Sequence, residues 1–237
     1  MPSYIFDTPN PKAGDQISLT GAEHHHLALV TRHKVGDSVR LNNGKGWLGV
    51  GSLIQITKTE SIVRITEALP VPGVPRYALA FSLLKSQNDE LVIEKGTELG
   101  VRDFFPFISR YTVRKAGDSA LARFNKLALA SIKQCDNPIL PHIHRIQDLA
   151  QSLDTIRSEG YLPVICSESR PDFWLNDLVL NGDKPCFMVG PEGGWSPDEL
   201  ELFKTQKLAQ ISLGNLVTRA ETASIAIAAQ HLLIAKT

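Results

Sequence analysis

The sequence predicts an α/β protein with a parallel sheet, preceded by a small β-barrel. Short segments with alternating or β-branched residues fill the first part of the chain. From Tyr77 onward, strand patterns alternate with helix patterns. Between the two parts lies LPVPGVPR, at residues 69–76, whose three prolines interrupt helices and strands alike. We therefore expect a barrel domain at residues 1–72 and an α/β domain at residues 73–237.

The composition argues against several classes of protein. Of 237 residues, 43% are hydrophobic, and 25 basic residues balance 25 acidic ones, which disfavours a strongly cationic coat but not a local patch. No apolar run reaches the roughly 18 residues of a membrane span, and the N-terminus lacks a secretory pattern. Cys135, Cys166 and Cys186 show no CxxC spacing. They are typical of reduced thiols, so we expect a cytoplasmic protein without membrane or metal partners.

Four strands and one helix are expected in the barrel domain. The helix should run from about Glu23 to Thr31, and Asn43–Gly44 is a hairpin turn signal. The strands are predicted at residues 17–19, 38–41, 48–56 and 61–65. Many short strands of this kind close naturally into a small barrel.

Two patterns in this domain suggest ligand sites. Residues 44–49 match GxGxxG, but a strand pattern follows where a dinucleotide-binding loop needs a helix, so we reject that site. Four histidines lie close together, at positions 24, 25, 26 and 33. Adjacent histidines on a helix point in different directions, which disfavours a shared metal. A polar helix face, a metal site and an RNA-facing role stay open from the residues alone.

The second domain should alternate strands and helices. Gly100 ends the first helix, and Asp136-Asn137-Pro138 ends the second. Ser196, Pro197 and Glu199 mark another helix start, with a capping box and proline at the first position. The strands are predicted at 78–83, 104–108, 162–166, 186–189 and 211–213, and the remaining helices at 88–99, 118–135, 149–158 and 221–235.

The last two strands each run into a glycine and then into a loop that precedes a helix. The first loop holds GPEGG at residues 190–194, whose paired glycines permit positive φ or close backbone approach. The second loop, residues 215–219, ends in Arg219, and Glu221 follows at the helix start. Neighbouring strand-to-helix loops form a ligand crevice at the carboxyl end of a parallel sheet. A structural salt bridge between Arg219 and Glu221 is an equally simple interpretation of that pair.

A basic segment precedes this region. Residues 102–133 hold seven basic residues against the acids Asp103 and Asp118. They are Arg102, Arg110, Arg114, Lys115, Arg123, Lys126 and Lys133. A solvated helix face explains them, and so does a patch that contacts phosphates without reading sequence.

Two segments of the chain resemble the last two motifs of the SPOUT-class RNA methyltransferases: GPEGG at residues 190–194 and LGNLVTRAETAS at residues 213–224. Within that class the chain most resembles the RsmE family, which methylates N3 of a uridine in 16S ribosomal RNA. KGTELGV at residues 95–101 is similar to another segment of that family. The resemblance implies S-adenosyl-L-methionine as cofactor, a PUA-like barrel, a C-terminal trefoil knot and a homodimer.

The resemblance also implies roles for individual residues. Arg219 would stabilise the anion that forms when N3 loses its proton, and Glu221 would accept that proton or orient Arg219. The implied cofactor-binding residues are Gly190, Pro191, Glu192, Gly193, Gly194, Leu213, Gly214, Leu216 and Thr222. The resemblance implies His26, Arg32 and Gln134 as RNA-binding residues, and the basic segment adds Arg114, Arg123, Lys126 and Lys133 as candidates.

Four positions depart from the family pattern. Lys133 stands where a glutamate is common, and Asn137 takes the place of an arginine. Thr218 and Thr31 each replace a leucine. The cofactor loops keep the pattern while the RNA side has changed. A SPOUT methyltransferase acting on transfer RNA and a non-catalytic RNA-binding homologue therefore remain alternatives.

Overall fold

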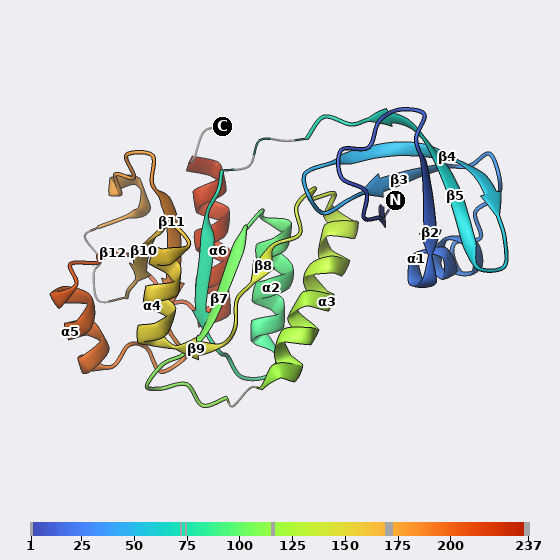
Figure 1. The fold of residues 1–237 in the computed structure, drawn as a ribbon. Coiled ribbons are helices and arrows are strands. Elements are labelled where there is room, and N and C mark those ends of the chain that lie inside the picture. Colours follow the sequence, from blue (N-terminus) through green and yellow to red (C-terminus); the bar gives the residue numbers. More distant parts are fainter. Residues whose placement is uncertain (1, 72, 74, 115–116, 169–172, 235–237) are drawn as a thin grey trace. The chain divides into compact units, whose positions relative to one another are not determined.

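The computed structural model of the chain describes residues 2–71, 73, 75–114, 117–168 and 173–234. Two compact units divide the chain (Figure 1). The first unit consists of Met1–Gly73 and Leu129–Leu140, and the second of Val74–Ala128 and Pro141–Thr237. The division after Gly73 falls inside the proline-rich segment. Residues 129–140 join the first unit, whereas the predicted limits of 1–72 and 73–237 assign them to the second domain.

A five-stranded sheet forms the first unit, in the order β1-β3-β4-β5-β2. Only β1 and β3 pair in parallel; the other pairs are antiparallel. Alternating side chains such as Ile17, Leu19 and Val63 fill its core. The strands are β1 (Tyr4–Ile5), β2 (Gln16–Thr20), β3 (Ser38–Asn42), β4 (Leu48–Ile56) and β5 (Glu60–Ala68). All four predicted strands are confirmed, and β4 begins within the GxGxxG match, at Leu48.

The predicted helix of this unit has two geometries. An α-helical turn, α1 (Gly21–His25), continues into a π-helical turn, η1 (His26–Val30). The Thr31 amide donates to the carbonyl of His26, five residues back, at 2.9 Å. The Thr31 hydroxyl donates to the same carbonyl at 3.0 Å, which helps hold the widened turn. Thr31, one of the departures from the family pattern, therefore ends this helix.

A seven-stranded parallel sheet forms the second unit. Its main order is β12-β10-β11-β6-β7-β8, and β9 pairs with β7. The central strands are buried on both faces, as β6, with the sequence ALAFS, shows. The strands are β6 (Ala78–Ser82), β7 (Asp103–Ile108), β8 (His142–Ile143), β9 (Gln147–Asp148), β10 (Tyr161–Cys166), β11 (Lys184–Val189) and β12 (Ala209–Ile211).

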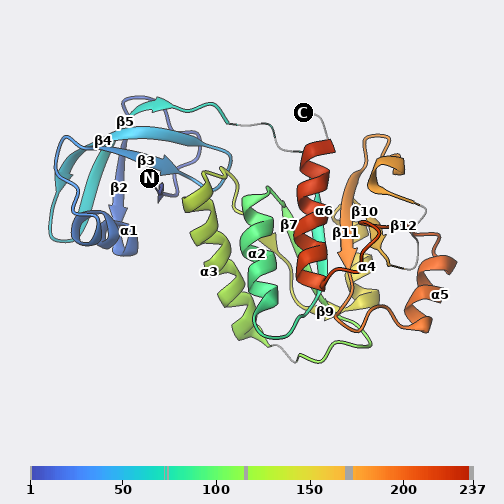
Figure 2. The same cartoon turned by 180° about the vertical axis from the view of Figure 1, so that it is seen from behind.

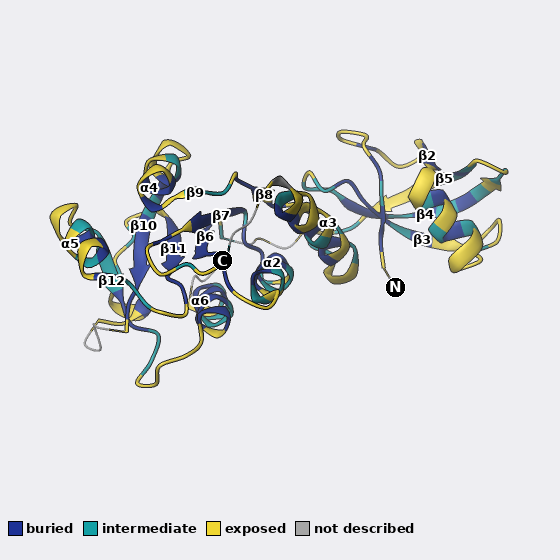
Figure 3. Ribbon diagram, turned by 90° about the horizontal axis from the view of Figure 1, so that it is seen from below, coloured by how far each residue is buried: buried dark blue, intermediate teal, exposed yellow. Residues whose placement is uncertain are grey.

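Helices cover both faces of this sheet (Figures 2 and 3). On one face pack α2 (Asn88–Glu98), α6 (Ala220–Ile234) and the first part of α3 (Asp118–Cys135). On the other face pack α4 (Leu149–Ser158) and α5 (Pro197–Thr205). All five predicted helices are present. In the part of the chain that is described, no helix is long and apolar enough to cross a membrane.

Candidate active site

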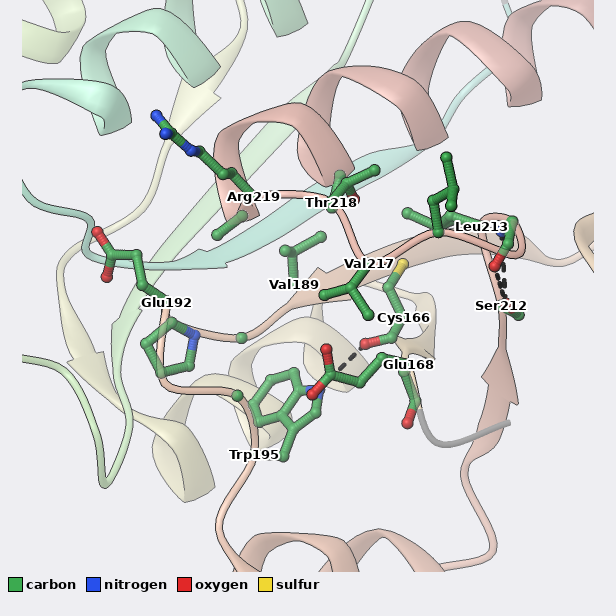
Figure 4. A pocket seen from close by; sticks show the side chains of 18 of the residues that line it. Cys166, Glu168, Val189, Glu192, Trp195, Ser212, Leu213, Val217, Thr218 and Arg219 are labelled. Carbon is green, nitrogen blue, oxygen red and sulfur yellow. Dashed lines mark hydrogen bonds between the residues drawn. The ribbon is translucent and has the colours of Figure 1, made fainter. Parts of the chain in front are cut away.

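A cavity of about 440 Å³ lies where β10, β11 and β12 end (Figure 4). Its size falls within the roughly 300–1,000 Å³ of small-molecule sites. Because the three strands are parallel neighbours, their carboxyl ends meet at one edge of the sheet. The lining residues are Cys166, Ser167, Glu168, Val189, Gly190, Pro191, Glu192, Gly194, Trp195, Ser212, Leu213, Gly214, Asn215, Leu216, Val217, Thr218, Arg219, Ala220 and Ala223.

Trp195 fastens the GPEGG loop to the end of β10. Its indole Nε1–H donates to the carbonyl of Cys166 at 3.0 Å, and its ring stacks on Phe107. A Cβ added to Gly190 would stand 3.0 Å from the Trp195 ring, so a larger residue here would press on the indole. Gly194 has φ of +71°, and its amide donates to Pro191 to close the turn. The predicted capping box of Ser196 and Glu199 then starts α5 and is confirmed.

Local hydrogen bonds also fix the start of the second loop. The Ser212 hydroxyl donates to the carbonyl of Gly214 at 3.1 Å, and the Ser212 amide donates to Phe173 at 2.7 Å. The Gln230 side chain on α6 donates to the carbonyl of Leu213 at 3.4 Å. Residues 215–219 beyond this anchor are exposed. The loop is therefore held at its base and open along the cavity.

Arg219 and Glu221 occupy different environments. Arg219 is exposed, lines the cavity and forms no salt bridge within the described residues. Glu221 is 9% exposed and is not among the lining residues. Its buried Oε2 has no hydrogen-bond partner among the described groups. In Figure 4 the side chains of Arg219 and Glu192 lie on the same side of the cavity, away from Ser212.

Most of the predicted cofactor-binding residues line this cavity. Gly193 and Thr222 do not: Gly193 lines a second cavity, and Thr222 is an exposed residue of α6. The sequence interpretation missed Cys166 and Glu168, because it applied the strand-end rule to two strands and not to the neighbouring β10. Burial raises the pKa of the Cys166 thiol far above its ordinary value. That thiol stays protonated and is a poor nucleophile.

The predicted RNA-binding residues of the second unit differ in exposure and in whether they already form a salt bridge. Arg114 forms an ion pair with Asp89, whose side chain is fully buried. Arg123 pairs with Glu90 at 2.8 Å while its own side chain stays 52% exposed. Lys126 is exposed and has no salt bridge among the described groups. Within this set, Lys126 is the cation most available to a phosphate.

In the first unit, Lys133 serves an internal contact. Its ammonium lies 2.7 Å from the carboxylate of Glu23, and each side chain is 19% exposed. The side-chain amide of Asn42 donates to the carbonyl of Asn137 at 2.9 Å. Lys133 and Asn137, the two departures at the end of α3, therefore belong to contacts that hold residues 129–140 to the barrel.

The other predicted RNA-binding residues of this unit remain accessible to different degrees. Gln134 and Arg32 are exposed, and Arg32 has φ of +56°. His26 is half-buried, and its ring lies 5.8 Å from that of Tyr4. His24 instead bonds Ser61 inside the unit, at 2.8 Å. His24 and His26 therefore have separate surroundings.

Known proteins resemble the whole chain. A family model described as an RNA methyltransferase domain matches residues 73–232, and one described as an RNA methyltransferase PUA domain matches residues 19–66. Ribosomal RNA small subunit methyltransferase E of Rickettsia conorii is 30% identical over 225 residues, 92% of this chain and 90% of the relative. The Bacillus subtilis protein of the same name is 26% identical, over 88% of this chain and 86% of its own.

A crystal structure shows the same likeness. Ribosomal RNA small subunit methyltransferase E from Neisseria gonorrhoeae, bound to S-adenosyl methionine, has a TM-score of 0.87 and 25% identity, covering 99% of this chain and 98% of that one. The predicted SPOUT-type α/β domain behind a PUA-like domain is confirmed, and the knot stays a prediction. Because the family model spans residues 73–232 and the Rickettsia conorii relative is 30% identical over most of its length, the chain belongs to the ribosomal RNA small subunit methyltransferase E family of RNA methyltransferases.

Proposed function

We propose that this protein transfers a methyl group from S-adenosylmethionine to N3 of a uridine in 16S ribosomal RNA, in the cytoplasm. The observation that carries the proposal is the 440 Å³ cavity between two strand-end loops in a chain of this family. The name of the relatives supports small-subunit ribosomal RNA as substrate. The S-adenosyl methionine bound to the Neisseria gonorrhoeae protein supports the cofactor.

The residues of the cavity fit S-adenosylmethionine. Gly194 and Gly214 lie on its wall, where missing side chains let a nucleoside approach the backbone. Val189 and Leu213 add apolar surface for an adenine ring. When bound, the cofactor supplies an activated methyl group, whose carbon leaves the sulfonium sulfur while the sulfur keeps the electron pair.

The protein must favour a uridine that has lost its N3 proton. That proton passes to solvent at the open side of the cavity, and the freed N3 electron pair forms the new bond to the methyl carbon. The negative charge spreads to the neighbouring carbonyl oxygens, where the guanidinium of Arg219 stabilises it. Glu221 is buried and does not line the cavity, so we do not assign it as the acceptor of this proton.

We also propose that the second unit forms a homodimer. Several large apolar side chains of this unit are exposed, among them Leu216 at 84%, Val217 at 79% and Leu233 at 82%. Exposed large apolar side chains of this kind occur at protein interfaces. On α6, Ala226 and Ala229 are partly exposed, and small side chains of this kind suit close approach of a partner helix.

A single experiment tests the reaction. The protein is incubated with methyl-labelled S-adenosylmethionine and small ribosomal subunits that lack the modification, with transfer RNA in a parallel reaction. We expect label at one uridine of 16S RNA, and nuclease mapping with mass spectrometry should place the methyl group on N3. Label on transfer RNA alone, or cofactor binding without transfer to either RNA, would contradict the proposal.

A further inference from the structure

A second cavity, of about 590 Å³, lies beside the first. Glu192 lines both cavities, and its side chain lies on the same side of the first cavity as that of Arg219 (Figure 4). The second cavity is lined by Lys85, Arg110, Tyr111, Thr112, Val113, Glu192 and Gly193. A group bound there would therefore lie next to the place where Arg219 acts.

Hydrogen bonds fix the backbone around this cavity. Thr112 Oγ1 lies 2.6 Å from the hydroxyl of Ser82 and accepts from the amide of Ser109 at 2.8 Å. The amide of Arg110 donates to the carboxylate of Glu199, the residue that also caps α5, at 2.9 Å. The turn after β7 is thus tied to the end of β6 and to the start of α5. The side chain of the next residue, Tyr111, projects from a fixed support.

The opposite wall is fixed as well. The amide of Lys85 donates to the Glu192 carboxylate at 2.8 Å, which ties the segment after β6 to the GPEGG loop. A Cβ on Gly193 would stand 3.1 Å from the Cβ of Tyr111. Glycine at this position therefore lets Tyr111 lie against the loop. This explains Gly193, which does not line the first cavity, as a residue that shapes the second.

The exposed groups of this cavity suit a nucleotide. Tyr111 is 44% exposed and offers an aromatic surface. Lys85 and Arg110 are exposed, and within the described residues neither side chain forms a salt bridge. An aromatic ring on which a base stacks, flanked by free cations that contact phosphates, is how proteins bind single-stranded RNA.

We propose that the second cavity binds the target segment of single-stranded RNA, with Tyr111 stacking on a base and Lys85 and Arg110 contacting its flanking phosphates. The inference rests on the proposed function, since it names the groups that present a uridine to the first cavity. A base must leave its stack before an enzyme can reach it, and an aromatic surface beside the reaction site compensates for the lost stacking.

The test measures binding of fluorescein-labelled hexauridylate by anisotropy at low salt, with no cofactor present. Tyr111→Ala should weaken binding about 5-fold to 150-fold, the loss that one base–aromatic stack represents. Tyr111→Leu, which keeps apolar bulk without an aromatic face, should lose a comparable amount, whereas Tyr111→Phe should bind like the wild type. Calorimetry should show that Tyr111→Ala binds S-adenosylmethionine with unchanged affinity.

A pair of charge variants separates the phosphate contacts from general electrostatics. Lys85→Gln should weaken hexauridylate binding and flatten its salt dependence. Lys184→Gln should change neither, because Lys184 is the first residue of β11 and the cavities lie at the other ends of the strands. Wild-type affinity in both Tyr111→Ala and Tyr111→Leu, or no binding of hexauridylate by the wild type, would overturn the inference. A wild type that binds hexauridylate through Tyr111 yet methylates no RNA would instead refute the proposed function alone.

Discussion

Trp195 should link the stability of the site to its affinity for the cofactor, and Trp195→Phe tests this. The substitution removes the 3.0 Å hydrogen bond to the Cys166 carbonyl, which contributes about 1 kcal/mol. The smaller ring also loses part of the packing on Phe107 and Phe203, roughly another 1 kcal/mol. For a chain of this size, a loss of about 2 kcal/mol lowers the melting temperature by about 4–8 °C.

Cofactor affinity should fall as well, because the GPEGG loop then has to be ordered against β10 during binding. If the hydrogen-bond energy of about 1 kcal/mol is lost from binding, affinity falls about fivefold. Calorimetry with S-adenosylmethionine and thermal melts with and without it measure both effects. Trp47→Phe is a matched control, since Trp47 packs against Phe6 in the first unit. Unchanged affinity for S-adenosylmethionine in Trp195→Phe would refute the role of Trp195 in ordering the GPEGG loop. An equal loss of affinity in Trp47→Phe would refute it as well.

Three further predictions concern the reaction, the assembly and the RNA. Arg219→Ala should slow single-turnover methylation by roughly 10²–10³-fold and leave cofactor affinity nearly unchanged, because its charge acts near the transition state; a well-folded variant with a near-native rate would end this assignment. Light scattering should show a dimer, and Leu233→Glu should shift it toward monomer; a wild-type monomer at micromolar concentration would contradict the proposed assembly. Reversing Arg123 and Lys126 to glutamate should weaken binding of small-subunit RNA but not of cofactor. Lys126→Glu alone should give most of the loss, because Arg123 already pairs with Glu90. Equal RNA affinity in the double variant would exclude a basic patch there.

Most helices and strands were predictable because each depends on nearby residues, but the two-residue strands β1, β8 and β9 were not predicted. Ser196, Pro197 and Glu199 mark the start of α5 in the sequence, and the structure shows the same capping box. The π-helical turn before Thr31 was not predictable, because its hydrogen-bonding pattern differs from that of an α-helix by one residue and the sequence period does not reveal this.

The arrangement of elements was less accessible to sequence reasoning. The position of β10 between β11 and β12 follows from the sheet order, and no local pattern encodes that order, so Glu168 was missed as a lining residue. The apolar face of α3 likewise does not show which unit its last turns join. That assignment depends on contacts such as Lys133–Glu23, between residues far apart in the sequence.

Calorimetric titration with S-adenosylmethionine tests most directly the central claim, that the strand-end cavity binds the cofactor. The variant is Gly194→Val, which places a side chain 3.3 Å from Glu168 on the cavity wall. Gly160→Val is the control, because Gly160 has a similar positive φ of +77° and open space around it, just before β10 begins. We predict that the wild type and Gly160→Val bind one cofactor per chain and that folded Gly194→Val binds none. Wild-type affinity in Gly194→Val would contradict the assignment of this cavity.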